Sequence, residues 1–162
     1  MLSLSPSDSA LALLKNYEQG PHGGFAPVAY RCPAGKLTIG WGHVIRAGES
    51  FPQPLTETAA DRLLRADLRD AVEDVRDQVR VPLTQSMFDA LVCFVFNVGG
   101  LAFAESTLRK RLNSGEYQAA ADEFPKWNKG RDPKTGRKKP LPGLTRRRAA
   151  ERALFIREAW PV

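Results

Sequence analysis

The chain has 162 residues, of which 43% are hydrophobic and 26% are charged, and its formal net charge is +6. These values are ordinary for a globular protein and fit one domain, or one domain with two lobes. With only two cysteines, Cys32 and Cys93, and no zinc-ligand spacing, the sequence excludes a disulfide framework and a zinc site of the usual type. The positive charge favours anionic partners, among them nucleic acids and the phosphates or carboxylates of cell-envelope polymers.

Membrane and export signals are missing from the sequence. No segment approaches the roughly 18 apolar residues that span a bilayer. The N-terminal sequence also has neither the basic region nor the apolar stretch of a signal peptide. We therefore expect a protein that is soluble where it is made.

The first predicted elements are a helix, a loop and a hairpin. Apolar residues at helical spacing predict the helix over 7–19, and glycines end it. The loop 20–27 leads to a strand, a turn and a second strand over 30–43. The turn is placed at 33–36, because the sequence PAGK has turn chemistry.

The rest of the chain is predicted to be mainly helical. In chain order we expect a helix from Thr56 to about Arg80, an apolar helix Thr84–Val98 ended by Gly99 and Gly100, short helices at about 106–113 and 116–127, a basic loop or small hairpin over 128–143, and a last helix from about Thr145 to Ala159.

An acidic residue stands at the end of the first predicted helix, just ahead of a glycine-rich segment. Glu18 lies in the string KNYEQG, and the segment YRCPAGKLTIGWGH begins twelve residues later. Within that segment, Gly40 and Gly42 indicate bends or a close backbone approach. A carboxylate at a helix end, facing a hairpin that carries Cys32, Thr38 and His43, is suited to acid-assisted hydrolysis.

These residues carry a family resemblance. The pattern Glu18-x-Gly20, then Tyr30-x-Cys32-x5-Thr38-Ile39-Gly40-x-Gly42-His43, resembles the active-site signature of the phage-type lysozymes, the endolysins of glycoside hydrolase family 24. Three later blocks, FDALVCFVFNVGG, STLRKRLNSGEY and PGLTRRRAAERALF, resemble later blocks of that family in the same order. The resemblance covers roughly residues 8–157. It implies a lysozyme-like α+β fold, mainly helical, with a hairpin lobe of about 20–55 and a helical lobe of about 1–19 and 56–162.

The resemblance implies that Glu18, Cys32 and Thr38 are the catalytic set. Glu18 would deliver a proton to the leaving oxygen, which suits a carboxylic acid with a pKa raised to about 6.

Cys32 stands where the best-known members carry an aspartate, so the two-carboxylate template is incomplete. Either Cys32 orients the attacking water together with Thr38, or Glu18 carries most of the catalysis. Our hypothesis is the first, although a free thiol is mostly protonated near pH 7. A covalent cysteine intermediate is disfavoured, because carboxylates are the usual nucleophiles on glycosides.

Three further residues are supporting groups by resemblance. His43 is expected to hold the hairpin and the following loop by hydrogen bonds, and Tyr30 to pack at the junction of the lobes. Arg147 is expected to pair with Glu18 and orient it, although the register leaves its two neighbours in the string RRR as alternatives.

Substrate contacts are expected from the second half of the chain. Phe96 and Asn97 match a pair that lines the substrate cleft of relatives, and the Asn97 amide would bond an N-acetyl group. Ser106 and Thr107 are weaker candidates, because their loop differs in length from that of relatives. Trp41 is interpreted as a core residue in preference to a sugar-stacking platform.

The predicted function is that of an endolysin with lysozyme (muramidase) activity. It would hydrolyse the β-1,4 bond between N-acetylmuramic acid and N-acetylglucosamine in peptidoglycan, with inversion and without metal or cofactor. His22 and His43 are the only histidines, and no ligand cluster surrounds them. We expect a monomer that stays in the host cytoplasm until a holin admits it to the periplasm and the cell wall.

Two other classes of function remain as alternatives. The missing aspartate favours a catalytically impaired, lysozyme-like module that binds the cell wall. Residues 126–152 carry eleven Lys or Arg against two acidic residues, which points to nucleic acid, but no helix-turn-helix or aromatic nucleic-acid motif accompanies them. The same basic region is a candidate contact with lipopolysaccharide phosphates, and a solvated loop is the simpler interpretation.

Overall fold

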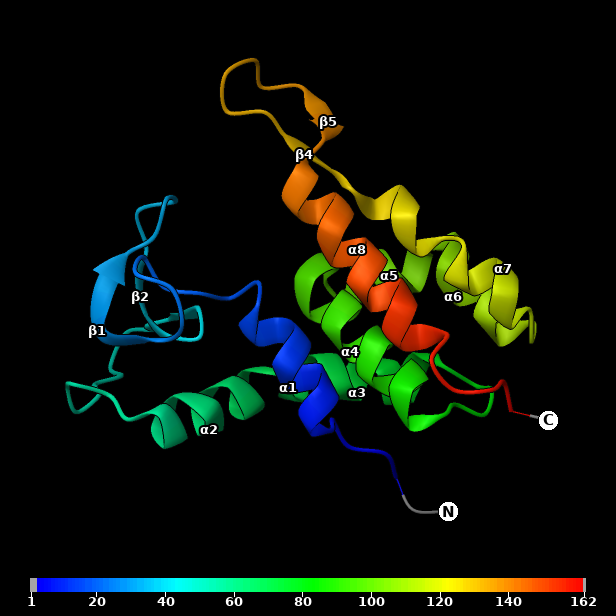
Figure 1. The fold of residues 1–162 in the computed structure, drawn as a ribbon, viewed down its shortest axis with the longest axis horizontal. Helices are drawn as coiled ribbons and strands as arrows, with labels where there is room; N and C mark the ends of the chain where they lie inside the picture. Colours follow the sequence, from blue (N-terminus) through cyan, green and yellow to red (C-terminus); the bar gives the residue numbers. More distant parts are fainter. Residues whose placement is uncertain (1–2, 162) are drawn as a thin grey trace. The chain divides into compact units, whose positions relative to one another are not determined.

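The structure, a computed structural model, describes residues 3–161 and divides into two compact units. One unit is Leu11–Asp70, and the other joins the residues before Leu11 to those from Ala71 onward. Helices dominate, and two small antiparallel sheets accompany them (Figure 1). The predicted α+β, mainly helical class is therefore confirmed. The lobe boundaries expected from the sequence stay a prediction.

The unit Leu11–Asp70 contains a three-stranded sheet. Its strands are β1 (Ala26–Arg31), β2 (Leu37–Gly40) and β3 (His43–Val44), each antiparallel to its neighbour in that order. The sequence predicted two strands over this segment. The third forms because the chain turns after β2, through Gly42 with a φ of +76°, and pairs back with it. Helix α1 (Asp8–Lys15) enters this unit, and α2 (Glu57–Asp67) lies within it.

Trp41 belongs to the core of this unit, as predicted, and is 7% exposed. Its indole Nε1 donates a hydrogen bond to Asp61 at 2.9 Å. The ring of Phe25 lies 5.9 Å from that of Trp41, and the Lys15 ammonium lies 5.2 Å from the Trp41 ring centroid. The other carboxylate oxygen of Asp61 accepts from Lys15 at 2.9 Å, so the indole is fixed on its polar edge as well as on its faces.

The helix predicted over 56–80 is two helices, α2 and α3 (Arg69–Gln78), which is a correction. The interruption falls at Leu68, whose φ and ψ of −74° and −10° place it in the right-handed helical region. No glycine or proline marks this point, so the local sequence gave no signal for it. The predicted apolar stripe is confirmed, since Leu64, Leu68 and Val75 are almost fully buried.

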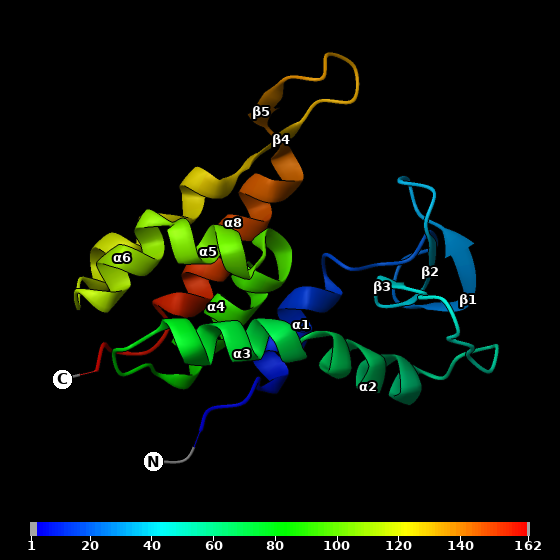
Figure 2. The ribbon, with the colours of Figure 1, turned by 180° about the vertical axis from the view of Figure 1, so that it is seen from behind.

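The second unit is built on α4 (Gln85–Val98), which is buried over nearly its whole circumference, as predicted. The Thr84 hydroxyl caps it by accepting the Met87 N–H at 3.1 Å. Helix α8 (Pro142–Phe155) packs along α4, as Figures 1 and 2 both show. Cys93 of α4 is fully buried and packs as a small hydrophobic residue. None of the helices formed by residues 3–161 combines the length and the apolar character that a membrane crossing requires.

The connection between α4 and α8 differs from the prediction at three places. Gly99 ends α4, but Gly100 begins a further helix, α5 (Gly100–Glu105), where a Cβ would lie 2.2 Å from the Asp74 carboxylate. The predicted helix 116–127 stops at Ala121, because Pro125 cannot continue the hydrogen-bond ladder. The elements in this stretch are α6 (Thr107–Asn113), α7 (Tyr117–Ala121) and the 3₁₀ helix η1 (Phe124–Trp127). The last helix begins at Pro142, earlier than predicted, because proline is favoured in the first helical turn.

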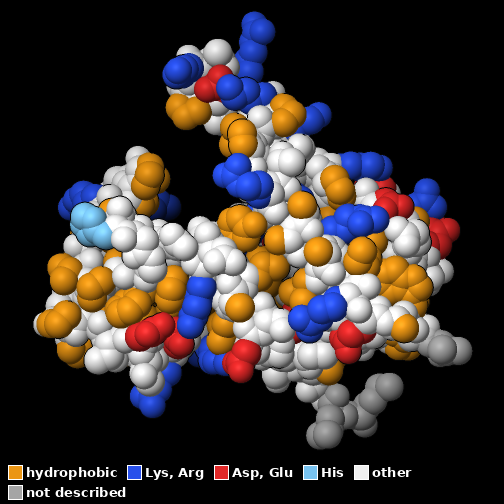
Figure 3. Space-filling model, viewed as in Figure 1, with side chains coloured by type: hydrophobic (Ala, Val, Ile, Leu, Met, Phe, Trp, Pro, Cys, Tyr) orange, Lys and Arg blue, Asp and Glu red, His pale blue; other side chains and the backbone are white. Residues whose placement is uncertain are grey.

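The basic segment 128–143 forms a small hairpin, one of the two predicted forms. Its strands are β4 (Lys129–Arg131) and β5 (Lys138–Pro140). A Cβ at Gly130 would lie 2.4 Å from a methyl group of Leu141, so one face of the hairpin packs against the start of α8. Lys and Arg side chains gather on the projecting end of this segment in Figure 3.

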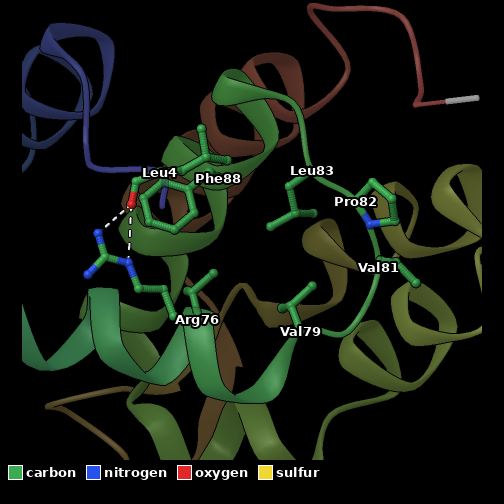
Figure 4. A pocket seen from close by; sticks show the side chains of 8 residues that line it. Leu4, Arg76, Val79, Val81, Pro82, Leu83 and Phe88 are labelled. Carbon is green, nitrogen blue, oxygen red and sulfur yellow. Dashed lines mark hydrogen bonds between the residues drawn. The ribbon is translucent and has the colours of Figure 1, made fainter. Parts of the chain in front are cut away.

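The segment before α1 is attached to the second unit by polar contacts beside an apolar pocket (Figure 4). The Arg76 guanidinium donates to the backbone carbonyl of Leu4, with Nε at 3.1 Å. Gln85 donates to the Ser5 carbonyl at 2.8 Å. The pocket has a volume of about 370 Å³ and is lined mostly by aliphatic side chains, with Phe88 at one wall.

Candidate active site

Glu18 follows α1 in a turn that continues the helix for a few residues. Its backbone N–H donates to the Leu14 carbonyl at 2.8 Å, and the Tyr17 N–H donates to the same carbonyl at 2.9 Å. The side chain of Glu18 is half-buried. The carboxyl is therefore held at the end of a helix with part of its surface accessible, as the sequence predicted.

Gly42 provides the space in which the Glu18 carboxylate lies. A Cβ at this position would be 2.8 Å from Oε2 of Glu18, closer than real Cβ contacts come. The backbone of Gly42 has a φ of +76°, which side-chain-bearing residues rarely adopt. The sequence signalled a close approach at this glycine, and the structure identifies the catalytic candidate as the approaching group.

Cys32 lies in the turn between β1 and β2. Its N–H donates to the Lys36 carbonyl at 2.9 Å, and its carbonyl accepts the Gly35 N–H at 2.7 Å. The pKa of the Cys32 thiol is lowered, first by the backbone N–H of Lys36, then by the N–H of Ala34, the hydroxyl of Thr38 and the charge of Lys36. Burial acts in the opposite direction. The turn is thus a small cradle of donors that favours the thiolate, a property that the sequence alone did not reveal.

Thr38 lies on β2 and is 3% exposed. Its hydroxyl donates to the Lys36 carbonyl at 3.0 Å and also interacts with the Cys32 sulfur. The cross-strand partner of Thr38 is Tyr30, because Cys32 lies beyond the end of β1. The side chains of Thr38 and Cys32 nevertheless meet through the turn.

Tyr30 lies close enough to both acidic groups to respond to their charge. Burial raises the pKa of its phenol, and the charges of Cys32 and Glu18 raise it further. A groove of about 450 Å³ opens beside these residues and is lined by Gln19, Tyr30, Cys32 and Pro33, among others. The carboxyl, the thiol, the hydroxyl and the phenol therefore belong to one neighbourhood within Leu11–Asp70. The expected place of Tyr30 at a junction of lobes stays a prediction.

His43 connects β3 to α2 and to the loop that follows β3. Its ring is 5% exposed, with Nδ1 2.8 Å from Asp67 and Nε2 3.1 Å from Glu49. The ring edge also contacts Phe51, at 5.5 Å between centroids. The pKa of Glu49 is lowered, first by the Arg46 N–H and then by His43. These bonds agree with the supporting role expected from the sequence.

In the second unit, Arg147 and Arg148 both bind the carboxylate of Glu151. Arg147 Nε donates to Glu151 at 3.1 Å and its Nη2 donates to the Cys93 carbonyl at 3.1 Å. Arg148 Nη1 donates to the other oxygen of Glu151. Arg147, Arg148 and Glu151 are 4%, 1% and 0% exposed. The pairing of Arg147 with Glu18 stays a prediction.

The predicted substrate contacts fall at the end of α4. Phe96 is half-buried and Asn97 is exposed. The Asn97 side-chain oxygen accepts a hydrogen bond from Arg148, and both residues line a pocket of about 510 Å³ with Trp127. One of the two lone pairs of the Asn97 oxygen is thereby used, and the amide N–H₂ provides the donors that a ligand can accept.

Ser106 is 4% exposed and caps α6. Its hydroxyl accepts the Arg109 N–H at 3.0 Å and donates to the Phe103 carbonyl at 2.6 Å. The hydroxyl is used within its own helix boundary, and its predicted contact with substrate finds no support in this position. A capping signal was available in the sequence, because serine is among the preferred N-cap residues.

Sequence reasoning missed two sets of residues around the site. The first is the donor cradle of Ala34 and Lys36, which acts through backbone groups that no side-chain motif reveals. The second is Glu151, whose spacing of three and four from Arg148 and Arg147 was the available signal. Among residues 3–161, no cluster of three or more His, Cys, Asp or Glu side chains has the geometry of a metal site.

Comparisons with known proteins agree with this arrangement. A model of the phage lysozyme family matches residues 20–151. The endolysin of Acyrthosiphon pisum secondary endosymbiont phage 1 is 42% identical over 149 residues, which cover 92% of this chain and 96% of that protein. The muramidase domain of SpmX from Asticaccaulis excentricus is 37% identical, with a TM-score of 0.80 over 94% of this chain and 98% of that one. The endolysin from Escherichia coli O157:H7 phage FAHEc1 is 32% identical, with a TM-score of 0.83 over 98% of both chains.

A mainly helical α+β fold that brings a carboxyl, a thiol and a hydroxyl into one neighbourhood has the arrangement of a glycoside hydrolase of the lysozyme type. The family model matches most of the chain, and the chain covers nearly the whole length of the endolysin to which it is 42% identical. The chain belongs to the phage lysozyme family.

Proposed function

We propose that this protein is an endolysin with muramidase activity, which cleaves the β-1,4 bond between N-acetylmuramic acid and N-acetylglucosamine in peptidoglycan. The observation that carries the proposal is the Glu18 carboxylate seated against Gly42, in the same neighbourhood as the bonded pair of Cys32 and Thr38. The names of the relatives, endolysin and muramidase domain, support the same activity.

In the proposed reaction, Glu18 is the general acid. Its protonated carboxyl donates to the glycosidic oxygen as the bond to the anomeric carbon breaks, so the leaving sugar departs as a neutral alcohol. Glu18 finishes the step as a carboxylate. It regains a proton from solvent before the next turnover, which its partial exposure permits.

Cys32 and Thr38 act on the attacking water. The Thr38 hydroxyl has one hydrogen, which either the Lys36 carbonyl or the Cys32 sulfur accepts, and its oxygen has lone pairs that accept a water hydrogen. The Cys32 thiolate, favoured by the N–H of Lys36 and Ala34, accepts the second hydrogen and takes that proton as the new C–O bond forms. A single displacement of this kind inverts the anomeric carbon. Inversion, like these roles, is part of the proposal.

The experiment that tests the proposal compares wild type with Glu18→Gln on chloroform-treated Gram-negative cells. We expect the turbidity loss caused by wild type to disappear with Glu18→Gln, because an amide cannot donate an acid proton. Glu57→Gln, an exposed position at the start of α2, is the matched control and should behave as wild type. Cell-wall binding without lysis by the wild-type protein would instead favour a binding module that lacks catalysis.

A second contact is proposed for the β4–β5 hairpin, with the phosphates of lipopolysaccharide. Arg131 and Lys138 are exposed and directly opposite one another in the ladder. Like charges in this position destabilise a hairpin, which favours an anionic partner that compensates them. Lys139 is different, because it lies 3.1 Å from Asp132, whose carboxylate also accepts the Lys134 N–H within the turn.

The test neutralises the hairpin charges that do not hold its turn. Lys134, Arg137 and Lys138 are replaced by glutamine and binding to vesicles that contain lipid A is measured. We expect weaker binding, with unchanged lysis of chloroform-treated cells. The control replaces three exposed cations outside the hairpin, Arg62, Arg80 and Lys110. Equal loss of binding in both triple variants would leave only a nonspecific effect of net charge and refute the contact.

The place and time of action belong to the proposal as well. Action on the cell wall follows from the proposed substrate. Storage in the host cytoplasm until a holin opens a path, and the monomeric state, are predictions from the sequence.

A further inference from the structure

The carboxylate of Glu151, in the second unit, belongs to a residue that is fully buried, at 0% exposed. Each of its oxygens accepts from a different guanidinium, one from Arg147 and one from Arg148. Burial raises the pKa of the Glu151 carboxyl, and the two guanidiniums oppose that shift. A carboxylate between two buried cations is costly to place in a protein interior, so its presence calls for a reason beyond packing.

Each guanidinium continues from Glu151 to a further group. Arg147 reaches the Cys93 carbonyl of α4 at 3.1 Å. Arg148 reaches the Trp127 carbonyl at 2.9 Å and the side-chain oxygen of Asn97. These bonds leave neither guanidinium free to rotate, because each is held at Glu151 and at one or more further points.

The Arg148 guanidinium is also fixed from its face. Its central carbon lies 5.0 Å from the centroid of the Phe94 ring, within the range of a cation–π contact. Phe94 is itself held edge-on by Trp127, at 5.4 Å between ring centroids. The position of the Asn97 side chain is thereby determined by a chain of contacts that begins at a buried carboxylate on another helix.

We propose that Glu151 is a positioning residue, which fixes the Arg147 guanidinium and, through Arg148, turns the Asn97 side chain so that its amide N–H₂ faces the ligand. This inference rests on the proposed function and on the predicted contact of Asn97 with the N-acetyl group of the substrate. Glu151 itself touches neither substrate nor reacting atoms.

The chemistry of the amide explains why orientation matters. An asparagine that is free to flip offers an oxygen or a nitrogen to the same ligand atom with similar ease. An acetamido carbonyl accepts hydrogen bonds, so only the N–H₂ end can bind it. Arg148 donates to the oxygen of Asn97 and so selects the orientation that the carbonyl of the substrate requires.

The first test is a double-mutant cycle between Asn97→Ala and Arg148→Lys, read as kcat and KM on soluble peptidoglycan fragments. Each single change should lower kcat/KM about 10-fold, mainly through KM, as expected for one lost hydrogen bond to substrate. Lysine keeps the charge beside Glu151 but cannot also reach Asn97 and the Trp127 carbonyl. If Arg148 acts through Asn97, the double variant should be less than about 2-fold worse than either single variant. Effects that multiply would overturn the inference.

The second test changes Glu151 itself. Glu151→Gln keeps the shape of the side chain and removes its charge, and we expect kcat/KM to fall about 100-fold because two guanidiniums are misplaced together. Glu151→Asp keeps the charge and should recover part of the loss. The matched control is Asp122→Asn, because Asp122 forms an exposed ion pair with Arg152, the residue next to Glu151. That control should leave kcat/KM unchanged.

A spectroscopic readout separates positioning from general loss of structure. The side-chain amide resonances of Asn97 should move in Arg148→Lys and in Glu151→Gln, while those of Asn113, which bonds Gln78, should stay in place. If Glu151→Gln does not fold, Arg148→Lys carries the test alone. Unmoved Asn97 resonances with unchanged kcat/KM would overturn the inference.

Failure of the proposed function has a different signature. If Asn97→Ala alone leaves kcat/KM unchanged, then Asn97 does not contact substrate. The positioning role falls with it, and the chemistry assigned to Glu18 stands. If Glu18→Gln remains active while the double-mutant cycle shows coupling, the acid has been misassigned and the positioning role survives.

Discussion

Two regions of the molecule hold charged groups in opposite ways. In the unit Leu11–Asp70, Glu18 and Cys32 are half-buried and are held by backbone groups and by the space at a glycine. In the second unit, Arg147 and Glu151 are buried and held by ion pairs with little exposure to solvent. Groups that exchange protons with water remain accessible in this arrangement, and groups that only orient others are enclosed.

The contrast has a physical basis. A buried ion pair gives a fixed geometry, and its removal leaves uncompensated charge. A backbone cradle such as the turn 32–36 stabilises an anion mainly through N–H donors, with the charge of Lys36 as a weaker cause, and leaves the anion in contact with solvent. The two regions are therefore expected to respond differently to mutation. Loss of a buried charge should lower stability as well as activity, whereas a change beside Glu18 or Cys32 should lower mainly activity.

The largest effect is expected from Glu151→Ala. This change leaves Arg147 and Arg148 buried without their carboxylate, and breaking a buried pair of this kind costs about 3–5 kcal/mol of the free energy of unfolding. Chemical denaturation measures it. Glu116→Ala is the control, because Glu116 pairs with Arg111 at the surface, where a pair contributes about 0–1 kcal/mol. Equal losses in the two variants would mean that burial does not distinguish them.

The next effect is expected from Gly42→Ala, and mainly in activity. The new Cβ would lie 2.8 Å from Oε2 of Glu18 and displace the carboxylate, which should lower the rate of wall lysis about 100-fold. Gly48→Ala is a matched control, since Gly48 has a φ of +83° and nothing within 4 Å of its Cβ position. Both variants bear the strain of a positive φ, so their difference measures the displacement of Glu18. Equal activities would contradict its place against Gly42.

A smaller effect is expected from Thr38→Val, which removes one of the groups that lower the pKa of Cys32. Wild-type Cys32 should be alkylated by iodoacetamide with a midpoint pH below that of an ordinary thiol, and the midpoint should rise in Thr38→Val. Because the thiolate is the reactive form, activity should fall as the pH drops through the pKa of Cys32, and this fall should begin at higher pH in the variant. Buried Cys93, whose pKa is raised chiefly by burial, serves as the unreactive internal reference. An unchanged midpoint would mean that the Thr38 hydroxyl does not lower the pKa of Cys32.

The smallest effect is expected from Glu49→Gln, and only in stability. The pKa of Glu49 is lowered in the folded protein, first by the Arg46 N–H and then by His43. A lowered folded pKa contributes stability above the unfolded pKa, and this contribution disappears as the pH falls through the folded value. The Tm of Glu49→Gln should therefore lie slightly below that of wild type near pH 7, and the two should converge as the pH falls through the lowered pKa of Glu49. A Tm difference that persists in acid would mean that the stabilisation does not come from the ionised Glu49 carboxylate.

Much of the fold could be predicted because its signals are local. The apolar helix around Met87 and Phe94, the turn at 33–36 and the position of Glu18 after a helix all follow from composition and spacing over short windows. The interruption at Leu68 could not be predicted, because leucine favours helices and the φ and ψ of Leu68 stay in the helical region.

The candidate site shows the same limit. Glu18, Cys32 and Thr38 could be singled out because a motif in sequence carries them. The donors that lower the pKa of Cys32 are backbone groups, and backbone groups have no signature in a sequence. Glu151 has one, at helical spacing from two arginines, but the same spacing also fits a solvated ion pair. Only burial distinguishes the two, and burial depends on how α8 packs along α4.

The most direct test of the account is mass analysis of the fragments that the purified protein releases from peptidoglycan. The account predicts disaccharide muropeptides whose new reducing end is N-acetylmuramic acid, released by wild type. Reducing ends on N-acetylglucosamine, or fragments cut within the peptide stems, would contradict it.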